Sequence, residues 1–510
     1  MIKVRKYSIK IKIILETVSL IALVFNACDV QKDESPGPNI VFIMADDLGY
    51  GEVSALNVNP DIGKIATPHI DRLAVEGMTF TDAHSGSAVC TPTRYGLLTG
   101  RYAWRTWLQS GVVQGHAPCL IDKETLTIAE MLREKGYATG IVGKWHLNFM
   151  YADSSTGEQL GKEHKFAPPV NSIIKDGPLD HGFDYFYGYH HSRDIQTVSE
   201  NRRVIAHKPP VAMLPGIEDK SIDFINRHAE KAASGQPFFL YVALSSPHSP
   251  VVPTEEWQGK SGLNDHADFV MQTDHTVGQI VEALDAAGLR ENTLVVFTSD
   301  NGTSGPTSNI EKLEEMGHYP SWILRGSKAD IWDGGHRLPF IVRWPEIIEM
   351  GSRNSTLICH TDFMPTIAGI VGINLPDNAA VDGFSYKEAF VGKESKKPRP
   401  PVVHHSISGK FAVRDGKWKL VLCPGSGGWS DPKDNQSKEK GLPDIQLYDM
   451  EKDLEEQHNL QAKHPEVVRK MVKKLEKIVV DGRSTSGRKL KNDIENIDVW
   501  KGITPVYYEK

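Results

Sequence analysis

The residues best able to do chemistry in this sequence lie in the segment from Cys90 to Gly100. Pro92 suits the first turn of a helix, where a missing N–H is not needed, and Gly100 suits the position just past a helix end. The segment therefore predicts a short helix with Cys90 at its N-terminus, where backbone N–H groups and the helix dipole attract an anion. Arg94 follows about one turn later, so its planar guanidinium can face the same anion.

Cys90 on its own allows two other interpretations. A single cysteine before a helix is often a buried structural residue, which behaves as a small apolar side chain. The same position would also suit a thiolate nucleophile, because a helix N-terminus and a nearby arginine lower the pKa of a thiol. A phosphatase-type anion loop needs a longer spacing, and Gly96 stands where its arginine would be.

Polar side chains also follow four apolar runs that are typical of buried strands. They are Asp46 and Asp47 after Asn39–Met44, Lys144 and His146 after Ala138–Val142, His248 after Phe238–Leu244, and Asp300 and Asn301 after Thr293–Thr298. Doubly wound sheets gather such strand ends in one crevice, so we expect these side chains to lie together. Three carboxylates and an amide oxygen form a hard site that favours Ca²⁺ first and Mg²⁺ next, whereas Zn²⁺ would recruit more nitrogen.

The spacing of Lys144 and His146 predicts the relative orientation of their side chains. Residues two apart in an extended chain point to the same side. We therefore expect the ammonium of Lys144 and the imidazole of His146 to face the site together.

Three patterns in the chain resemble the signatures of the type I sulfatases, a branch of the alkaline-phosphatase superfamily. They are Cys-x-Pro-x-Arg-x-x-x-x-Thr-Gly at 90–100, Gly-Lys-Trp-His at 143–146, and Arg-Gly-Ser-Lys followed by Asp-Gly-Gly-His-Arg-Leu-Pro at 325–339. Asn148 and Asp333 depart mildly from the family's usual Gly and Glu. The resemblance extends over roughly Asn39 to Leu460 and implies a sulfuric ester hydrolase, the EC 3.1.6 class.

The resemblance implies a modified nucleophile and a metal. Cys90 would be converted to formylglycine, an aldehyde, by a formylglycine-generating enzyme or an anaerobic sulfatase-maturating enzyme. One calcium ion would be held by Asp46, Asp47, the group made from Cys90, Asp300 and Asn301. The hydrated aldehyde would attack the sulfur, with Asp300 or a neighbouring ligand helping to remove its proton. Arg94, Lys144 and Lys328 would offset charge on the sulfate oxygens.

The implied second half of the reaction uses two histidines. His248, with Lys328, would protonate the leaving alcohol oxygen. His146 would take a proton as the sulfated intermediate collapses to the aldehyde and expels sulfate.

Length and patterning indicate an α/β fold. The chain has 510 residues, enough for a large core and a second unit. We expect a large, mostly parallel sheet flanked by helices over 39–392, a linker over 393–401, and a C-terminal α+β subdomain over 402–510. That subdomain would combine a short antiparallel sheet, with Asp415-Gly416 as a hairpin turn, and a long helix over Pro465–Val480. Residues 151–175 are predicted to be irregular, and Gly305–Tyr319 mobile.

The N-terminus predicts export. A basic start, an apolar run centred on Val18–Phe25 and the small Ala27 are typical of a secretory signal over 1–28. Phe25-Asn26-Ala27-Cys28 resembles a bacterial lipobox, with Cys28 lipidated as a membrane anchor and 29–38 as a tether. The expected location is the periplasm or the outer-membrane surface of a bacterium; simple cleavage and secretion is the alternative. The remaining cysteines, Cys119, Cys359 and Cys423, allow at most one disulfide.

The sequence predicts the chemical class of the substrate. A net charge of −7 argues against broad nucleic-acid binding, and an exported sulfatase suggests a sulfated polysaccharide or glycan. Candidate sugar contacts are His190, His191 and Arg193, with His404 and His405 from the smaller subdomain. The alternatives are a phosphomonoesterase or phosphodiesterase of the same superfamily, and a glycan-binding surface lipoprotein whose Cys90 is not matured.

Overall fold

The computed structural model describes residues 37–57 and 59–505. The predicted signal segment 1–28, Cys28 itself and most of the tether 29–38 lie outside the described residues. Pro38 begins one compact unit that contains all the elements below. Within the described ranges, no helix is both long and apolar enough to cross a membrane.

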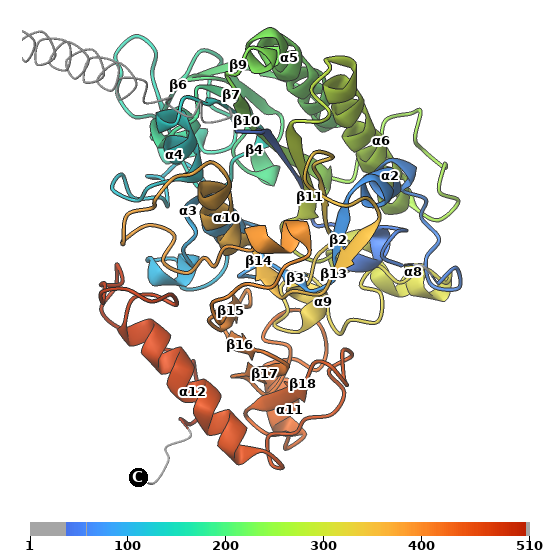
Figure 1. Ribbon diagram of the computed structural model, residues 1–510, viewed down its shortest axis with the longest axis vertical. Helices are drawn as coiled ribbons and strands as arrows, with labels where there is room; N and C mark the ends of the chain where they lie inside the picture. The colour runs from blue at the N-terminus through green and yellow to red at the C-terminus, as the bar shows by residue number, and fades with distance from the viewer. Residues whose placement is uncertain (1–36, 58, 506–510) are drawn as a thin grey trace, which may run out of the picture. The chain divides into compact units, whose positions relative to one another are not determined.

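A twelve-stranded mixed sheet forms the centre of this unit (Figure 1). Its strands, in spatial order, are β13 (Ser352–Asn354), β2 (Met78–Phe80), β12 (Phe340–Arg343), β11 (Thr293–Ser299), β1 (Asn39–Asp46), β10 (Phe238–Pro247), β4 (Ala138–Lys144), β7 (Tyr185–Tyr189), β8 (Thr197–Glu200), β9 (Arg203–His207), β6 (Ile173–Lys175) and β5 (Met150–Ala152). The five neighbours β11, β1, β10, β4 and β7 run parallel. This arrangement confirms the predicted large sheet, which is parallel at its centre, whereas most of the flanking strands pair antiparallel.

Helices cover both faces of the sheet, which explains why β1 is a continuous apolar run. Ile40, Phe42 and Met44 face a core shared with α3 (Cys90–Thr99), α4 (Ile128–Glu134) and α10 (Phe363–Ile370). The alternate residues of the strand face a second core shared with α2 (Pro68–Glu76), α5 (Met213–Ala233) and α6 (Asp265–Ala286). Apolar side chains are therefore favoured at every position from Ile40 to Ala45.

Two segments contain more secondary structure than local patterning predicts. Residues 151–175 are not wholly irregular, because β5 and β6 pair antiparallel at the edge of the large sheet. Gly305–Tyr319 contains two short helices, α7 (Gly305–Ser308) and α8 (Ile310–Glu315). Both segments are polar, and their structure comes from pairing or packing with distant parts of the chain, which local patterning does not reveal.

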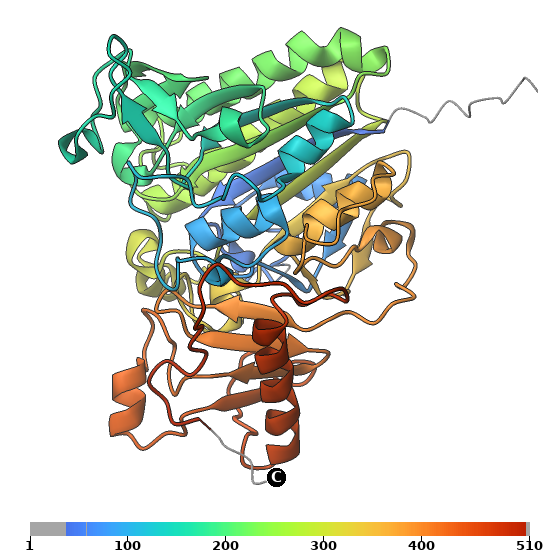
Figure 2. The same ribbon diagram turned by 90° about the vertical axis from the view of Figure 1, so that its left-hand side faces the viewer.

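The C-terminal part is a smaller α+β layer, as predicted. β15 (Val402–His405), β16 (Phe411–Asp415), β17 (Trp418–Val421) and β18 (Gln446–Asp449) form an antiparallel sheet, with α11 (Asp434–Glu439) beyond β17. The hairpin turns at Gly416, whose φ of 57° favours glycine. Helix α12 (Pro465–Val480) lies beside this sheet (Figure 2) and buries Met471 and Leu475 in the same apolar cluster as Val413 and Leu420.

The cysteines of the described residues are unpaired. Among the described residues, Cys90, Cys119, Cys359 and Cys423 are buried free thiols, so the possible internal disulfide is not formed.

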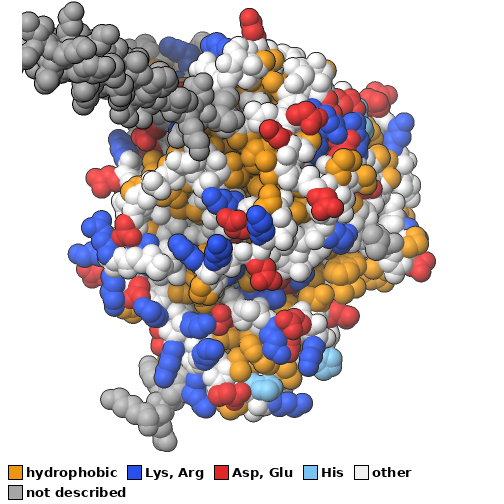
Figure 3. All heavy atoms as spheres, in the orientation of Figure 1, with side chains coloured by type: hydrophobic (Ala, Val, Ile, Leu, Met, Phe, Trp, Pro, Cys, Tyr) orange, Lys and Arg blue, Asp and Glu red, His pale blue; other side chains and the backbone are white. Residues whose placement is uncertain are grey.

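On the face shown in Figure 3, acidic and basic side chains are interspersed. A mixed surface of this kind agrees with the mild net charge of the chain.

A buried ion pair connects the N-terminal and C-terminal parts of the unit. Arg105 donates to both carboxylate oxygens of Asp382 at 2.7 Å, and both side chains are fully buried. The guanidinium also donates to Ile478 O and Asn492 Oδ1, and Asp382 accepts from Ser484. Burial opposes ionisation of Asp382, but Arg105 holds its pKa below the ordinary value.

We expect the substitution Asp382→Ala to destabilise the protein by about 3–5 kcal/mol, because it leaves the Arg105 charge buried without its partner. The measurement is the urea dependence of tryptophan fluorescence. Asp223→Ala is the matched control, since Asp223 pairs with Arg227 on exposed α5, where both side chains are about half accessible, and exposed pairs contribute little. Equal destabilisation by the two variants would contradict the prediction.

Candidate active site

Helix α3 presents Cys90 as its first residue, as the sequence predicts. All ten residues from Cys90 to Thr99 are buried, and Gly100 ends the helix with a φ of 63° and an N–H bonded to Gly96 O. A fully buried helix leaves its N-terminal N–H groups directed at protein rather than at water. The thiol of Cys90 therefore lies where an anion would be stabilised.

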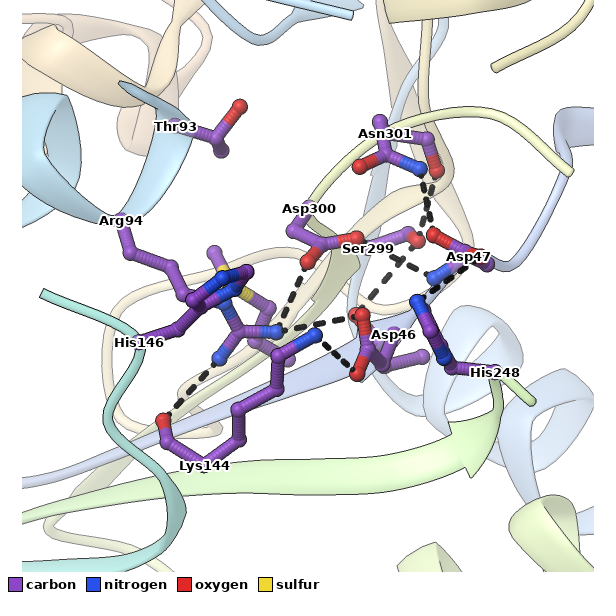
Figure 4. A network of polar contacts seen from close by, with 12 residues as sticks. Asp46, Asp47, Thr93, Arg94, Lys144, His146, His248, Ser299, Asp300 and Asn301 are labelled. Atoms are coloured by element: carbon purple, nitrogen blue, oxygen red, sulfur yellow. Dashed lines mark hydrogen bonds and ion pairs between the residues drawn. The ribbon is translucent and has the colours of Figure 1, made fainter. Parts of the chain in front are cut away.

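The strand ends meet because β11, β1, β10 and β4 are consecutive parallel neighbours. Asp46 is the last residue of β1, Lys144 is the last residue of β4, and Asp300 follows β11 directly. Asp47 has a φ of 69°, and this turn lets its N–H donate to Asp300 Oδ1 at 3.1 Å. Figure 4 shows these side chains converging, which confirms that the predicted strand ends form one cluster.

Each of the three carboxylates is paired with a buried cation. Lys144 Nζ lies 2.6 Å from Asp46 Oδ2. Lys328 Nζ contacts both oxygens of Asp47 at 2.6 and 2.7 Å. Arg94 Nη2 donates to Asp300 Oδ2 at 2.7 Å. Burial opposes ionisation of Asp46 and Asp47, but the neighbouring cations hold both pKa values below the ordinary range.

The oxygen-rich side of this cluster fits a hard metal ion. Asp46 Oδ1 and Asn301 Oδ1 are buried and accept no hydrogen bond. One atom each from Asp46, Cys90 and Asp300 lie within 4.8 Å of one another. Buried acceptors without donors are costly, so both oxygens are candidate ligands for a cation. The atoms that would bind the metal are oxygens, with at most one group from Cys90. A ligand set of this kind favours Ca²⁺ over Zn²⁺.

The thiol of Cys90 is not activated as a thiolate. Burial raises its pKa, and Lys144 and Lys328 only partly oppose the effect. A thiolate nucleophile requires a lowered pKa. The electrostatics therefore count against the cysteine itself as the nucleophile.

His248 faces the same carboxylates from the end of β10. Its Nε2 lies 3.6 Å from Asp47 Oδ2, and its Nδ1 is 2.6 Å from Ser249 O. The side chain is 12% exposed, so it lies at the rim of the otherwise buried cluster. Burial lowers its pKa even though Asp47 opposes the shift.

The expected geometry of Lys144 and His146 is wrong in detail. Strand β4 ends at Lys144, and His146 has a φ of 54°, so the chain between them is not extended. Gly143, with a φ of 118°, also departs from ordinary strand backbone just before Lys144. His146 still lies near Lys144: its Nδ1 is buried without a partner, and burial with Lys144 holds its pKa well below the usual value.

The candidate sugar contacts divide into two groups. His190 and His191 lie beside His146, with ring centroids 6.1 and 4.5 Å away, and Arg193 is exposed nearby in the chain. His404 and His405 are buried elsewhere: His404 stacks on His336 and His405 packs against Phe411. The expectation that this pair reaches the crevice is not met, because β15 directs both rings into the protein.

Sequence reasoning did not single out Tyr241 and Ser299. The hydroxyl of Tyr241, from the middle of β10, lies 3.4 Å from Arg94 Nη1. Ser299 Oγ accepts from Leu48 N and donates to Asn301 O, so it fixes the turns on both sides of the site. The only available signal was a hydroxyl inside an apolar strand or at its end.

Asp194 anchors the segment that carries His190 and His191. Its oxygens accept from Tyr151 Oη at 2.8 Å and from Thr197 Oγ1 at 2.5 Å. Burial raises the pKa of Asp194 to about 7, although these two hydrogen bonds oppose the shift.

The raised pKa predicts a pH dependence of stability. In the unfolded chain Asp194 ionises near 3.8. Between about pH 3.8 and 7 the folded state therefore binds more protons, and the stability contributed by this group falls as pH rises through that range. We expect Asp194→Asn to flatten the fall in Tm measured by differential scanning calorimetry between pH 5 and 8. An unchanged slope would contradict this assignment, and Asp153→Asn, at an exposed aspartate, is the control.

Comparisons with known proteins agree with this geometry. A family model described as Sulfatase matches residues 38–373, and one described as N-sulphoglucosamine sulphohydrolase, C-terminal, matches 327–481. The chain is 33% identical over 502 residues to an N-acetylgalactosamine-6-O-sulfatase of Bacteroides thetaiotaomicron, covering 88% of this chain and 95% of that protein. It is 32% identical over 460 residues to human arylsulfatase A, covering 83% of each chain.

Solved structures show the same likeness. One, from work on the metabolism of multiple glycosaminoglycans by Bacteroides thetaiotaomicron, superposes with a TM-score of 0.74 and 31% identity, over 87% of this chain and 99% of that one. Another, Ps i-CgsB in complex with a neocarrahexaose, gives a TM-score of 0.68 and 25% identity over 89% and 95% of the two chains.

Proposed function

The chain belongs to the sulfatase family, and from that premise we propose that it removes O-sulfate from a sulfated glycan, using a formylglycine made from Cys90 and one bound calcium ion. The observation that carries the proposal is the pairing of three buried cations with three carboxylates around the N-terminus of α3. A sulfate ester brings negative charge, and a buried site can hold it only where fixed positive charge is already present.

The cations are suited to the sulfate oxygens. Arg94, Lys144 and Lys328 have exposed fractions of 0%, 0% and 6% and are oriented by their carboxylate partners. They need little reorganisation when charge develops on the substrate, which is the condition for electrostatic stabilisation of a transition state. The backbone N–H groups of α3 add positive potential on the same side.

Lys328 and His248 are the candidates for protonating the leaving oxygen. Both lie at Asp47, and Asp47 raises the pKa of Lys328 despite its burial, so the ammonium keeps its protons. His248 is at the accessible rim, where the sugar would project. His146 Nδ1 has no hydrogen-bond partner, so its lone pair is free to accept a proton.

Calcium and formylglycine would supply the remaining chemistry. When bound, a calcium ion polarises a sulfate oxygen as a Lewis acid, and formylglycine provides a hydrated aldehyde oxygen as nucleophile. Asp46, Asp47, Asp300 and Asn301 would hold the ion, in keeping with the two unpartnered oxygens described above. The raised pKa of the Cys90 thiol supports a modified nucleophile over the cysteine itself.

The similarity to an N-acetylgalactosamine-6-O-sulfatase over most of both chains makes a 6-O-sulfated amino sugar the first substrate to test. His190, His191 and Arg193 are the proposed sugar-side residues, because they lie on the segment beside His146.

Sulfate release tests the proposal. We expect protein shown by peptide mass spectrometry to carry formylglycine at position 90 to release sulfate from N-acetylgalactosamine 6-sulfate faster than from its 4-sulfate isomer. Cys90→Ala should lose activity by at least about a thousandfold, as expected when a covalent nucleophile is removed. Release of phosphate from matched phosphate esters, without sulfate release, would overturn the assignment. Arg193→Ala in the same panel should raise KM for saccharides and leave a small aryl sulfate unaffected.

Metal removal gives an independent test. We expect dialysis against a calcium chelator to abolish sulfate release and lower Tm, because an ion that binds only the folded chain stabilises it. Ca²⁺ should restore both properties more fully than Mg²⁺. Asn301→Ala is the matched variant and should need more Ca²⁺ for the same activity. Full activity in protein whose calcium content has been shown to be negligible would contradict the proposed metal site.

A further inference from the structure

A large open groove lies between the basic segment 393–401 and the chain that follows α12. Its main hollow has a volume of about 1230 Å³ and is lined by parts of 383–388, by 393–401, by Lys474 of α12 and by 484–486. A second hollow of about 510 Å³ shares Pro401, Lys474 and 484–486 with it. The two hollows together are here called the basic groove. The residues that line it are distinct from those of the active-site cluster.

The basic groove is positive although the chain as a whole is negative. Its main hollow is lined by two acidic side chains, Glu388 and Glu394, and by six basic ones, which are Lys387, Lys393, Lys396, Lys397, Arg399 and Lys474. The whole chain instead contains 58 basic and 65 acidic residues. In Figure 3 basic side chains predominate beside α12, at the lower left of a face that is otherwise mixed. A concave surface with charge of one sign attracts ligands of the opposite sign.

Three of the groove's cations have no carboxylate partner. Lys393, Lys396 and Lys397 are exposed, and none of them forms an ion pair with another part of the chain that the structure describes. By contrast, Arg399 pairs with Asp362 at 2.7 Å and Lys474 pairs with Asp415. The three unpaired ammonium groups can therefore contact an external anion without breaking an ion pair.

Buried contacts hold one wall of the groove in place. Asp362 is fully buried, and it accepts hydrogen bonds from Cys359 N at 2.7 Å and Phe384 N at 2.8 Å as well as pairing with Arg399. Lys387 Nζ donates to Gly369 O at 3.0 Å. The segment with the three unpaired lysines is therefore attached to the core next to α10.

The opposite wall is fixed in the same way. Ser484 Oγ donates to Asp382 Oδ1 at 2.6 Å, and Asp382 is the buried partner of Arg105. Thr485 Oγ1 donates to Val381 O at 2.9 Å. With both walls held by buried groups, little conformational freedom is lost when a ligand binds between them.

Shape and side-chain chemistry favour a sulfated carbohydrate chain as the ligand. Hydroxyl groups of Ser385, Ser395 and Ser486 line the groove among its lysines. Hydroxyls donate and accept hydrogen bonds, as sugar hydroxyls do, and ammonium groups bind sulfate. A groove admits a chain, whereas a membrane surface is contacted by the outward face of an amphipathic helix or of a basic segment.

We propose that the basic groove binds a stretch of sulfated polysaccharide outside the active site, with Lys393, Lys396 and Lys397 contacting its sulfate groups. The choice of a sulfated polymer rests on the proposed function, whereas the capacity of the groove to bind an anion does not. A single contact between an exposed lysine and a sulfate is weak and screened by salt, so several contacts must act together. A polymer held here is at high effective concentration for the active site of the same molecule.

Binding of dextran sulfate to the Cys90→Ala protein tests the proposal, because this protein does not consume sulfate esters. By isothermal titration calorimetry at low ionic strength, we expect dextran sulfate to bind and unsulfated dextran not to bind. Adding Lys393→Ala, Lys396→Ala and Lys397→Ala together should weaken binding by about tenfold or more and reduce its salt dependence, since fewer counterions are released. These ammonium groups hold no ion pair, so Tm should not change.

A second triple variant controls for net charge. Lys123→Ala, Lys231→Ala and Lys260→Ala remove the same charge at exposed positions outside the groove. This variant should bind dextran sulfate almost as tightly as the Cys90→Ala protein. Equal weakening by the two triple variants would show that overall charge controls binding, and would overturn the proposal.

Lysine acetylation locates the contact without any lysine substitution. Bound dextran sulfate should protect Lys393, Lys396 and Lys397 of the Cys90→Ala protein from acetylation, read by peptide mass spectrometry, and leave Lys123 and Lys231 unprotected. If the groove variant does not fold, this protection decides the question alone. Uniform protection, or none, would overturn the proposal.

Two further outcomes would also overturn it. One is failure to bind dextran sulfate, or binding of unsulfated dextran with equal affinity. The other is binding to vesicles of anionic phospholipid that requires the groove lysines, without binding of dextran sulfate, which would identify a membrane as the ligand. None of these measurements requires turnover, so a failure of the matured protein to release sulfate would count against the proposed function and not against the groove.

Discussion

The structure depends on a buried balance of charge at the ends of its central strands. Asp46, Asp47 and Asp300 cannot be buried as anions without Lys144, Lys328 and Arg94, and the reverse is equally true. One carboxylate oxygen, Asp46 Oδ1, and one amide oxygen, Asn301 Oδ1, still accept no hydrogen bond after this pairing. These oxygens could bind a further cation, and the site lies in the part of the chain that matches the sulfatase family.

The sheet and helices serve this balance by making water exclusion possible. Helices on both faces bury β1 completely, so its carboxylates emerge into a low-dielectric crevice where each ion pair is strong. Helix α3 is itself buried and brings Cys90 and Arg94 to the same place. Rigid positioning of this kind stabilises a transition state more effectively than flexible surface charges do.

The C-terminal sheet helps to position this site. Its first strand packs against the segment that precedes Cys90, through the hydrogen bond between His404 Nδ1 and Ser85 O and the backbone bond from Ala88 N to His405 O. The Arg105–Asp382 pair joins the two parts again on the side of α12. The position of Cys90 therefore depends on residues more than 300 positions away in the sequence.

Local rules of periodicity and capping were enough to predict the central strands, the Cys90 helix and the polar residues at the strand ends, but not β5, β6, α7 or α8. Tertiary structure alone decided the rest. The turns at Asp47 and His146 use left-handed backbone that spacing does not reveal, and the pairing of each carboxylate with its own cation depends on strand order. His404 shows the same limit, since its place in β15 was predictable but the partners of its ring, His84 and His336, are set only when distant segments pack.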